Sequence, residues 1–342
     1  MSEARLRVRR ALRESVPDDS ELVLVACSGG ADSLALALAA GDEVRSGNAL
    51  IGAVIVDHGL QTDSAHVAVS AAEACRRAGL DPVEVIRVEV AQGPGHGGPE
   101  AAARTARRVA LQDAAHRHGA VAVLLAHTRD DQAETVLMRL ARGSGARSLA
   151  AMAPVEGLWR RPLLDLPRDV VRSSLDGEEA WEDPHNTDPR YTRVRVRAEV
   201  MPVLVAGLGG DVVDGLARSA RLLRDDADAL DAAADQSWQR VSVTVPEGQA
   251  LDVEALAALP RALRTRLLRR AALEAGVPAN DLTLAHVDRM EALVSDWKGQ
   301  GAIDLPGGVG VRRSYGRLAL GRVASVDERR GRRPQDSPAP EE

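Results

Sequence analysis

Residues 22–40, LVLVACSGGADSLALALAA, change character twice within a short distance. The first five residues are apolar and include two valines, which predicts a short buried strand. Residues 33–40, SLALALAA, are rich in alanine and leucine, which favours a helix. The polar stretch SGGADS at residues 28–33 therefore lies where a strand passes into the N-terminus of a helix.

A strand-to-helix junction of this composition is suited to holding an anion. Backbone N–H groups point outward at a helix N-terminus, the helix dipole favours negative charge, and glycine lets a ligand approach the backbone closely. A plain connection between the two elements is the alternative interpretation. The candidate anion-binding residues are Ser28, Gly29, Gly30, Ala31, Asp32 and Ser33.

Two common phosphate-binding loops are excluded by the residues present. A Walker A loop needs a lysine on the phosphates, whereas Lys298 is the one lysine in the chain. The stretch is not GxGxxG either, so a dinucleotide fingerprint fails. A helix terminus supplies only about 0.3–1 kcal/mol at an exposed site, which is too little for a triphosphate. A carboxylate such as Asp32 beside phosphates indicates Mg²⁺ between them.

The composition is that of an ordinary globular protein with 342 residues, 45% of them hydrophobic, and a net charge of -6. The length allows two domains. No apolar run reaches the roughly 18–20 residues that span a bilayer, and the charged first residues lack the apolar core of a secretory signal, so we expect a cytoplasmic protein without a membrane partner. Cys27 and Cys75 form no CxxC motif, and Cys27 is expected to pack beside the turn.

Arginines are grouped along the chain although the net charge is negative. A local basic surface of this kind fits a phosphate-rich partner, and an ordinary solvated face is the alternative. The groups are Arg139, Arg142 and Arg147, then Arg160 and Arg161, then Arg190, Arg193, Arg195 and Arg197.

Apolar runs and helical patterns alternate through the first part of the chain. Alternation of strands and helices predicts a doubly wound α/β domain, with a mainly parallel sheet covered on both faces. Ligands of such sheets bind at the carboxyl ends of the strands, where SGGADS, DHG at 57–59 and HTRDDQAET at 127–135 fall. The expected strands cover residues 22–26, 49–56, 82–90 and 120–126, and the expected helices 33–40, 62–78, 99–118 and 130–141.

From residue 207 onward the composition changes to long segments of Ala, Leu, Arg and Asp. These predict amphipathic helices over residues 212–235, 253–275 and 282–295, with a short strand at 242–245. A hairpin-like end follows, with Pro306-Gly307-Gly308 as its turn. We therefore expect a catalytic domain at residues 1–206, a mainly helical second domain at 207–326, and a disordered tail at 327–342.

Several titratable residues follow the expected strands. Asp130, Asp131 and Glu134 share one helix, and clustered acids indicate a metal-bound nucleotide or a cationic substrate, unless they merely complement the helix dipole. His127 is a candidate general acid or base, or a structural residue. Asp57 and His58 either shape a pocket for a base or ribose or belong to a simple turn.

At this point the motifs resemble those of a known family. SGGADS resembles the signature of the ATP-pyrophosphatase (PP-loop) superfamily, which has the adenine nucleotide alpha hydrolase-like fold and cleaves ATP to AMP and pyrophosphate. A further set narrows the resemblance to the tRNA(Ile)-lysidine synthetase family. The matching stretches are DHGL at 57–60, EAAARTAR at 100–107, AHTRDDQAET at 126–135, RGSG at 142–145, RPLL at 161–164 and EDPHNTDPRYTRVRVR at 182–197.

The resemblance implies an ATP-dependent ligase. In that family ATP adenylates the C2 oxygen of the wobble cytidine in an isoleucine tRNA with a CAU anticodon. The amine of free L-lysine then displaces AMP, and decoding changes from AUG to AUA. By the same resemblance Asp32, Asp131 and Glu134 are catalytic, Asp131 and Glu134 bind lysine, and Asp32 and Asp130 hold Mg²⁺. The implied ATP-binding residues are the loop 28–33 together with Asp57, His58, Arg104, His127 and Arg142; the implied tRNA-binding residues are Arg190, Arg193, Arg195 and Arg197.

The sequence departs from the family pattern at Gln61, Arg108 and Arg129. These departures concern individual contacts rather than the loop. The alternating stretch RVRVR at residues 193–197 fits a strand by its period and a helix by its surroundings, so both stay open. The oligomeric state also stays open, a homodimer included. The rival functions are another PP-loop tRNA-modifying enzyme, such as a thiolase, and a non-catalytic ATP-binding module.

Overall fold

The computed structural model describes residues 2–17, 21–59, 61, 63–90, 99–245 and 248–322. It divides into two compact units, Met1–Arg224 and Asp225–Glu342. The division falls inside helix α10 (Val212–Val241) rather than near residue 206, because the helical pattern of that segment continues without a break. The expected tail at 327–342 lies outside the described residues, as does Leu60 of the DHGL motif.

The first unit contains a six-stranded, mainly parallel sheet in the order β3-β2-β1-β4-β6-β5. Strands β1 to β4 and β6 run parallel, and β5 pairs antiparallel with β6 at one edge. The order confirms that the three polar stretches follow neighbouring strands. The strands are β1 (Leu22–Ala26), β2 (Leu50–Asp57), β3 (Val83–Arg87), β4 (Ala122–Leu124), β5 (Val155–Glu156) and β6 (Trp159–Arg160).

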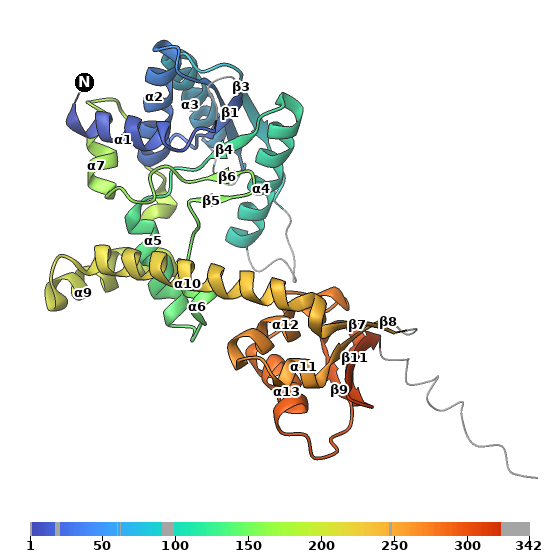
Figure 1. The fold of residues 1–342 in the computed structure, drawn as a ribbon. Coiled ribbons are helices and arrows are strands. Elements are labelled where there is room, and N and C mark those ends of the chain that lie inside the picture. The colour runs from blue at the N-terminus through green and yellow to red at the C-terminus, as the bar shows by residue number, and fades with distance from the viewer. Residues whose placement is uncertain are drawn as a thin grey trace, which may run out of the picture. The chain divides into compact units, whose positions relative to one another are not determined.

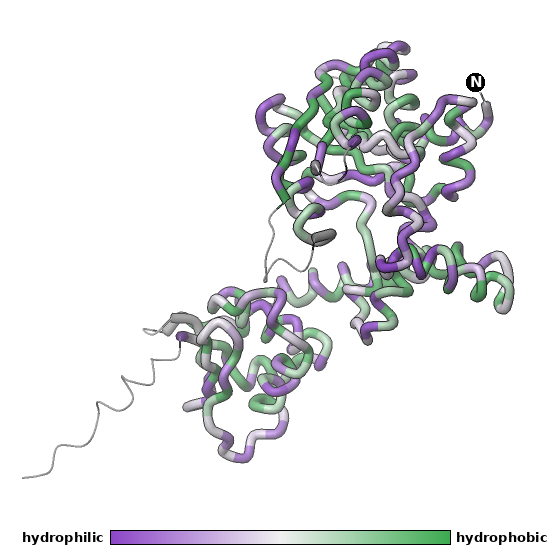
Figure 2. Tube along the Cα trace, turned by 180° about the vertical axis from the view of Figure 1, so that it is seen from behind, coloured by the Kyte–Doolittle hydropathy of each residue, from purple (hydrophilic) through white to green (hydrophobic). Residues whose placement is uncertain are grey.

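Helices cover both faces of this sheet, which confirms the doubly wound fold (Figure 1). One face packs against α1 (Glu3–Arg13), α2 (Ala31–Arg45) and α3 (Ser64–Ala78), and the other packs against α4 (Pro99–His118). The strands are accordingly apolar on both sides, as the green interior of the sheet in Figure 2 shows.

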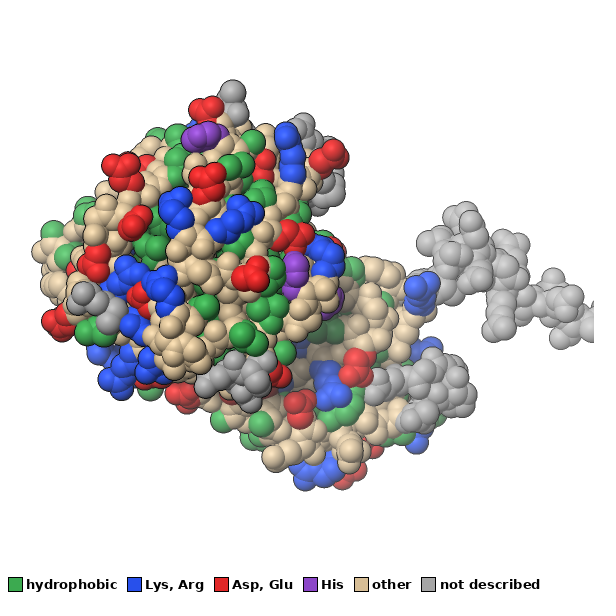
Figure 3. Space-filling view, turned by 90° about the horizontal axis from the view of Figure 1, so that it is seen from above, with side chains coloured by type: hydrophobic (Ala, Val, Ile, Leu, Met, Phe, Trp, Pro, Cys, Tyr) green, Lys and Arg blue, Asp and Glu red, His purple; other side chains and the backbone are tan. Residues whose placement is uncertain are grey.

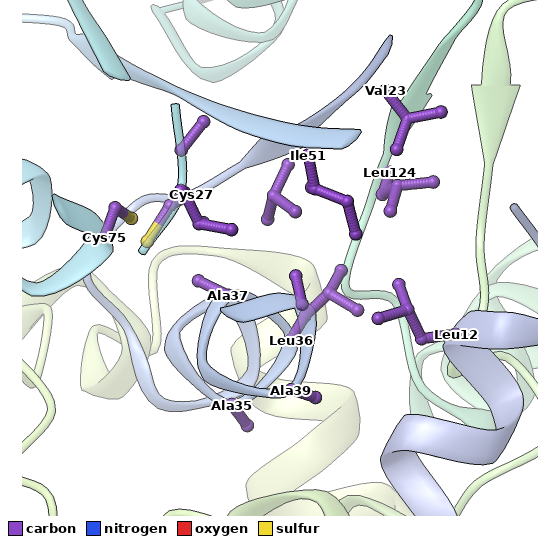
Figure 4. Close-up of a cluster of buried hydrophobic side chains, with 14 of the residues drawn as sticks. Leu12, Val23, Cys27, Ala35, Leu36, Ala37, Ala39, Ile51, Cys75 and Leu124 are labelled. Atoms are coloured by element: carbon purple, nitrogen blue, oxygen red, sulfur yellow. The ribbon is translucent and has the colours of Figure 1, made fainter. Parts of the chain in front are cut away.

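The core under α2 joins small and branched side chains from α1, α2, α3 and the strands β1, β2 and β4 (Figure 4). Leu36 of α2 lies between Leu12 of α1 and Ile51 of β2, and each of these three side chains is at most 1% exposed. Cys27 and Cys75 are buried free thiols that face each other in the same core, so Cys27 packs beside the turn as expected.

The rest of the first unit is a series of short helices. The stretch RVRVR is helical, since α8 passes directly into a single π-helical turn, η2. A period-two pattern over five residues is too short to outweigh the helical segments on either side. The elements are α5 (Arg129–Leu140), α6 (Ala146–Leu149), α7 (Arg168–Ser173), η1 (Pro184–Thr187), α8 (Thr192–Arg195), η2 (Val196–Val200) and α9 (Met201–Leu208).

The second unit contains more strand than the sequence predicted. Its antiparallel sheet has five strands in the order β7-β8-β11-β10-β9, packed on α11 (Val253–Ala257), α12 (Arg261–Glu274) and α13 (Leu284–Ser295). Pro260 divides the single helix expected over 253–275, because proline lacks the N–H that a helix interior requires. The strands are β7 (Ser242–Val245), β8 (Gly248–Asp252), β9 (Ile303–Leu305), β10 (Val309–Ser314) and β11 (Arg317–Arg322).

The turn at Pro306-Gly307-Gly308 is confirmed, since the short helix η3 (Pro306–Gly308) connects the antiparallel strands β9 and β10. Within the described part of the chain, no single helix is long and apolar enough to cross a membrane, and one pair of helices bent by 99° passes that test only when taken together.

Candidate active site

The polar loop after β1 is held by its own side chains. Gly29 has φ 82°, a left-handed conformation that glycine adopts without strain, and a Cβ there would lie 3.4 Å from side-chain atoms of Val67 and Ala71. The hydroxyl of Ser33 accepts a hydrogen bond from the Ser28 N–H at 3.0 Å and donates to the Gly30 carbonyl at 3.0 Å. These bonds and the packing of Gly29 fix the shape of the loop.

The N-terminus of α2 has no side chain that caps it. Gly30 is its N-cap residue and has no side chain to accept from the first N–H groups, whereas the N-terminus of α5 is capped by Thr128. The first N–H groups of a helix have no partner within the helix. These groups of α2 receive no acceptor from their N-cap residue, and the anion site predicted for residues 28–33 stays a prediction.

Asp32 lies in the first turn of α2 with its side chain 24% exposed. Burial raises the pKa of this carboxyl, and nearby Asp131 raises it further, while Arg168 and Arg172 oppose the change. The distances to their Nε atoms, 3.9 and 3.5 Å, are long for hydrogen bonds, and Asp32 Oδ1 is buried without a hydrogen-bond partner. This unpartnered oxygen fits Mg²⁺.

A metal ion at this place would depend on the substrate for most of its ligands. The described residues include no group of three or more His, Cys, Asp or Glu side chains placed to hold a metal. Mg²⁺ often binds through one or two carboxylates together with substrate phosphates and water. The second expected ligand, Asp130, already accepts the backbone N–H of Arg168 on its Oδ2 atom at 2.8 Å.

Asp131 and Glu134 lie one turn apart on α5 and are 8% and 1% exposed. Both carboxylates are bridged by the same two arginines. Arg168 Nη2 lies 2.9 Å from Asp131 Oδ1 and 3.0 Å from Glu134 Oε1. Arg197 lies 3.2 Å from Asp131 Oδ1 and 2.8 Å from Glu134 Oε1. The acidic pair is thus a site for cationic groups.

Asp131 also serves its own helix. Its Oδ2 atom accepts hydrogen bonds from the Thr128 N–H at 2.8 Å and the Thr128 hydroxyl at 2.9 Å, which completes a capping box. Burial raises the pKa of Asp131, but Arg168 and these Thr128 bonds outweigh it and leave the pKa lowered. The two interpretations of this acid, helix cap and charged site residue, therefore both apply.

Arg168 is a site residue that the sequence analysis missed. It begins α7 directly after Pro167, contacts Asp130, Asp131 and Glu134, and lies near Asp32. The run DLPRDVVR at 165–172 offered a helix-start signal, but nothing in the sequence showed that this helix begins beside the acids of α5.

Two histidines with lowered pKa follow neighbouring strands, His58 after β2 and His127 after β4. Burial lowers the pKa of His58, and burial together with Arg161 and Arg107 lowers the pKa of His127 to about 3 against the opposing effect of Asp131. The Nδ1 atom of each ring is buried without a hydrogen-bond partner. Two neutral imidazoles with open nitrogen atoms fit a neutral polar group such as a nucleoside.

Asp57 ends β2 and supports that corner. Its Oδ1 atom accepts the Gly59 N–H at 2.9 Å. Burial raises the pKa of Asp57, yet the Gly59 and Ser64 hydrogen bonds and Arg87 outweigh it, so the pKa is lowered. The carboxylate stays charged and shapes the turn. Arg104, an exposed residue of α4, acts electrostatically on His127, which follows β4.

The four arginines expected to face tRNA are engaged within the first unit. Arg193 and Arg197 point to Glu134, with Arg193 Nε at 3.8 Å from its Oε2 atom. Arg190 pairs with Asp188 at 2.6 Å, and Arg195 donates to the Pro189 carbonyl at 2.6 Å. Acidic and basic side chains are interspersed over the face shown in Figure 3.

Arg142 lies at the opposite end of α5 from Asp131 and Glu134, and its expected contact with ATP stays a prediction. Arg142 follows the C-terminal end of α5, whereas the acids and Thr128 lie at its N-terminal end. At about 1.5 Å per residue the two ends are separated by roughly 20 Å.

Comparison with known proteins identifies the class of domain to which the first unit belongs. A family described as "PP-loop domain" matches residues 3–204. The U34-tRNA thiolase NcsA from Methanococcus maripaludis has a similar fold, with a TM-score of 0.52 and 19% identity over 65% of this chain and 78% of that chain. The first unit is therefore a PP-loop domain.

A match to the second unit and the similarity to full-length relatives identify the family of the whole chain. A family described as "TilS substrate binding domain" matches residues 251–319. The tRNA(Ile)-lysidine synthase of Thermobifida fusca is 57% identical and that of Streptomyces coelicolor 53% identical; the alignments cover 92% and 87% of this chain and 96% and 85% of theirs. The chain belongs to the tRNA(Ile)-lysidine synthase family.

Proposed function

We propose that this chain ligates L-lysine to C2 of the wobble cytidine of an isoleucine tRNA with a CAU anticodon. ATP adenylates the C2 oxygen and releases pyrophosphate, and the amine of lysine then attacks C2 and displaces AMP. The product would decode AUA in place of AUG. The observation that carries the proposal is an uncapped, glycine-shaped helix N-terminus beside a buried pair of acids, in a chain with this family membership.

The chain's own residues would hold ATP at the ends of β1 and β2. The N–H groups of residues 31–33, at the start of α2, would bind the pyrophosphate portion, and the neutral rings of His58 and His127 would offer open nitrogen atoms to the nucleoside. Asp32 Oδ1 would hold Mg²⁺, which supplies charge neutralisation for the leaving pyrophosphate. The mixture of amides and one carboxylate explains how the loop functions without lysine.

Asp131 and Glu134 would receive the side-chain ammonium or α-amine of lysine. Two arginines occupy these acids, and their side chains differ in accessibility, with Arg168 12% exposed and Arg197 32% exposed. A cationic substrate would therefore displace Arg197 more readily than Arg168. In this arrangement Arg168 stays bound to Asp131 and Glu134 and keeps them charged, while the lysine amine replaces Arg197.

The arginines of residues 190–197 would bind part of the tRNA. The reaction would take place in the cytoplasm, where tRNA, ATP and lysine are all available. These side chains would have to exchange their present partners for phosphate oxygens, which arginine binds well through its planar fork. Affinity should then fall steeply with salt, since neutralised phosphates release counterions.

The decisive experiment follows AMP formation with tRNA and lysine supplied together and separately. We expect stoichiometric AMP, pyrophosphate and lysine incorporation only with a CAU-anticodon isoleucine tRNA and lysine both present. Incorporation without tRNA, or none with that tRNA, would reject the lysidine reaction. Sulfur transfer to tRNA would favour a thiolase, and nucleotide binding without turnover would favour the non-catalytic module.

A further inference from the structure

The hairpin of β10 and β11 ends in a turn with an unusual residue. Tyr315 and Gly316 form the turn and have φ of 48° and 73°. Turns of this left-handed kind favour glycine, asparagine and aspartate, because a larger side chain is disfavoured there. Tyr315 therefore occupies a position that its backbone conformation does not explain.

The ring of Tyr315 does not pack against the chain either. Its side chain is 103% exposed, whereas Trp159 and Trp238 are 6% and 9% exposed and Trp297 is 37% exposed. The chain has four tryptophans, two tyrosines and no phenylalanine, so an aromatic ring left in water is exceptional for this sequence. The placement indicates a partner outside the chain.

The hairpin holds this ring rigidly. Six residue pairs join β10 and β11, from Val309 with Arg322 to Ser314 with Arg317. Val311 and Leu318, on the inner face, are both fully buried. A side chain at the tip of such a hairpin is positioned by the core of the second unit rather than by a loose loop.

Three arginines flank Tyr315 in the sequence, Arg312, Arg313 and Arg317. Arg312 and Arg317 are exposed, and neither makes an ion pair with any of the described residues. Arg313 lies over the ring of Trp297 at 5.2 Å and donates to the Leu293 carbonyl at 2.7 Å. The stretch RRSYGR at residues 312–317 thus combines an exposed aromatic ring with two exposed arginines, Arg312 and Arg317.

Two carboxylates lie nearby on the same sheet. Asp252 is opposite Arg317 in the register and accepts the Ala255 N–H at 2.8 Å, as the cap of α11. Asp304 is opposite Gly310, two residues from Arg312. The tip itself, residues 312–317, contains no acid, so its local charge is positive.

We infer that this hairpin tip, residues 312–317, is a tRNA contact in which Tyr315 stacks on a nucleobase and Arg312 and Arg317 bind the flanking phosphates. Every base offers a face for aromatic stacking, and an arginine beside it supplies the phosphate contact that single-stranded or looped RNA requires. The hairpin lies within residues 251–319, which match the substrate-binding family. This inference rests on the proposed function and adds to it the surface through which the second unit binds tRNA.

Tyr315→Asn tests the ring without threatening the fold, because asparagine favours the left-handed turn. We expect a 5- to 100-fold loss of tRNA affinity, on the order of one lost base stack. The KM for tRNA rises accordingly, while kcat, the KM values for ATP and lysine, and the unfolding midpoint stay unchanged. Tyr315→Phe, which keeps the ring, should bind tRNA as the wild type does.

Arg312→Gln and Arg317→Gln test the phosphate contacts. Each should reduce the slope of log affinity against log salt by about 1, whereas Arg7→Gln, at an exposed arginine of α1, should leave the slope unchanged. If the wild type modifies tRNA and Tyr315→Asn binds tRNA with the same affinity as the wild type, the inference is overturned and the proposed function stands. A wild type that neither binds nor modifies tRNA overturns both. If Tyr315→Phe loses affinity as Tyr315→Asn does, stacking is rejected.

Discussion

At the scale of single residues, two neighbouring carboxyls of the first unit have pKa values shifted in opposite directions. Burial raises the pKa of Asp32, whose Oδ1 atom has no partner, while arginine and backbone donors keep the pKa of Asp131 low. Two nearby carboxyls with opposite shifts indicate different tasks. Asp32 gains most from a bound cation, and Asp131 with Glu134 is already organised around cationic groups.

Asp32→Asn should abolish turnover and preserve the fold. Loss of one charge-stabilising group typically costs about 10²–10³ in rate. The unfolding midpoint should stay the same or rise slightly, because burial disfavours the ionised carboxyl that is removed. AMP formation and thermal unfolding measure the two effects, with Asp113→Asn, at an exposed residue of α4, as the matched control. Normal turnover of Asp32→Asn with Mg²⁺ would falsify the role assigned here.

His127 should remain neutral throughout the physiological range. Its pKa of about 3 lies below the ordinary histidine value of about 6.5. Between these two pH values the unfolded chain therefore binds a proton at this histidine and the folded state does not. Its contribution to stability is thus complete above about pH 6.5 and is lost as the pH falls toward 3. NMR titration of the histidine ring protons measures the midpoint directly, and a midpoint near 6 for His127 would contradict the inference.

The same property excludes one mechanistic role for His127. A histidine that is neutral down to about pH 3 supplies no imidazolium acid between pH 5 and 8. We therefore expect His127→Gln to lower the rate without changing the shape of the pH–rate profile. An acidic limb near pH 6 that is present in the wild type and absent from the variant would show the opposite.

At the scale of elements, α1 is held to α2 by charge as well as by Leu12. Glu43 is 1% exposed and accepts hydrogen bonds from Arg9 at 2.7 Å and Arg13 at 2.9 Å. Glu43→Gln leaves these arginines without their charge partner and should destabilise the first unit by about 2 kcal/mol, less than a fully buried pair because Arg13 is 61% exposed. Glu14→Gln is the control, since its pair with Arg10 is exposed and should contribute little.

The pH dependence of the Glu43 effect has a definite sign. Burial raises the pKa of Glu43, but its bonds with Asn48, Arg9 and Arg13 outweigh burial and lower it. The contribution to stability is then present above the ordinary glutamate pKa of about 4.3 and is lost as the pH falls below it. Chemical denaturation at pH 7 and pH 3.5 should show the difference between wild type and Glu43→Gln shrinking, and an equal difference at both values would argue against it.

Element type was predictable where a period or a helix signal was strong, and the placement of side chains was not. Residues 22–40 indicated β1, the loop and α2, because the change from apolar run to glycines to alanine-leucine repeat is local. The contact of Arg197 with Glu134 joins residues 63 positions apart, and no local pattern encodes it. The hairpin turn at Tyr315 was missed because turn signals favour Asn-Gly or Asp-Gly over Tyr-Gly.

At the scale of the whole molecule, the proposed sites divide two binding tasks between the two units. The first unit contains the uncapped N-terminus of α2, the acids of α5 and the two neutral histidines, and the second unit contains the exposed hairpin tip. ATP and lysine are small enough to bind to one unit alone. A tRNA, by contrast, is large enough to contact both, so ligand size should determine which units respond.

Hydrogen–deuterium exchange measures this separation. Saturating ATP with Mg²⁺ should slow exchange at residues 31–33, because phosphate oxygens become acceptors for N–H groups that lack one in the helix. Exchange at residues 57–59 should slow as well, since the nucleoside is proposed to lie beside them. At a concentration of 100 Kd the ligand stabilises its unit by about 2.7 kcal/mol, or roughly 100-fold slower exchange for amides that open only by unfolding of that unit. Exchange at residues 251–319 should not change with ATP and should slow at 312–317 when tRNA is added. Protection of the second unit by ATP, with none at residues 31–33, would place the nucleotide elsewhere and reject the site at the end of β1.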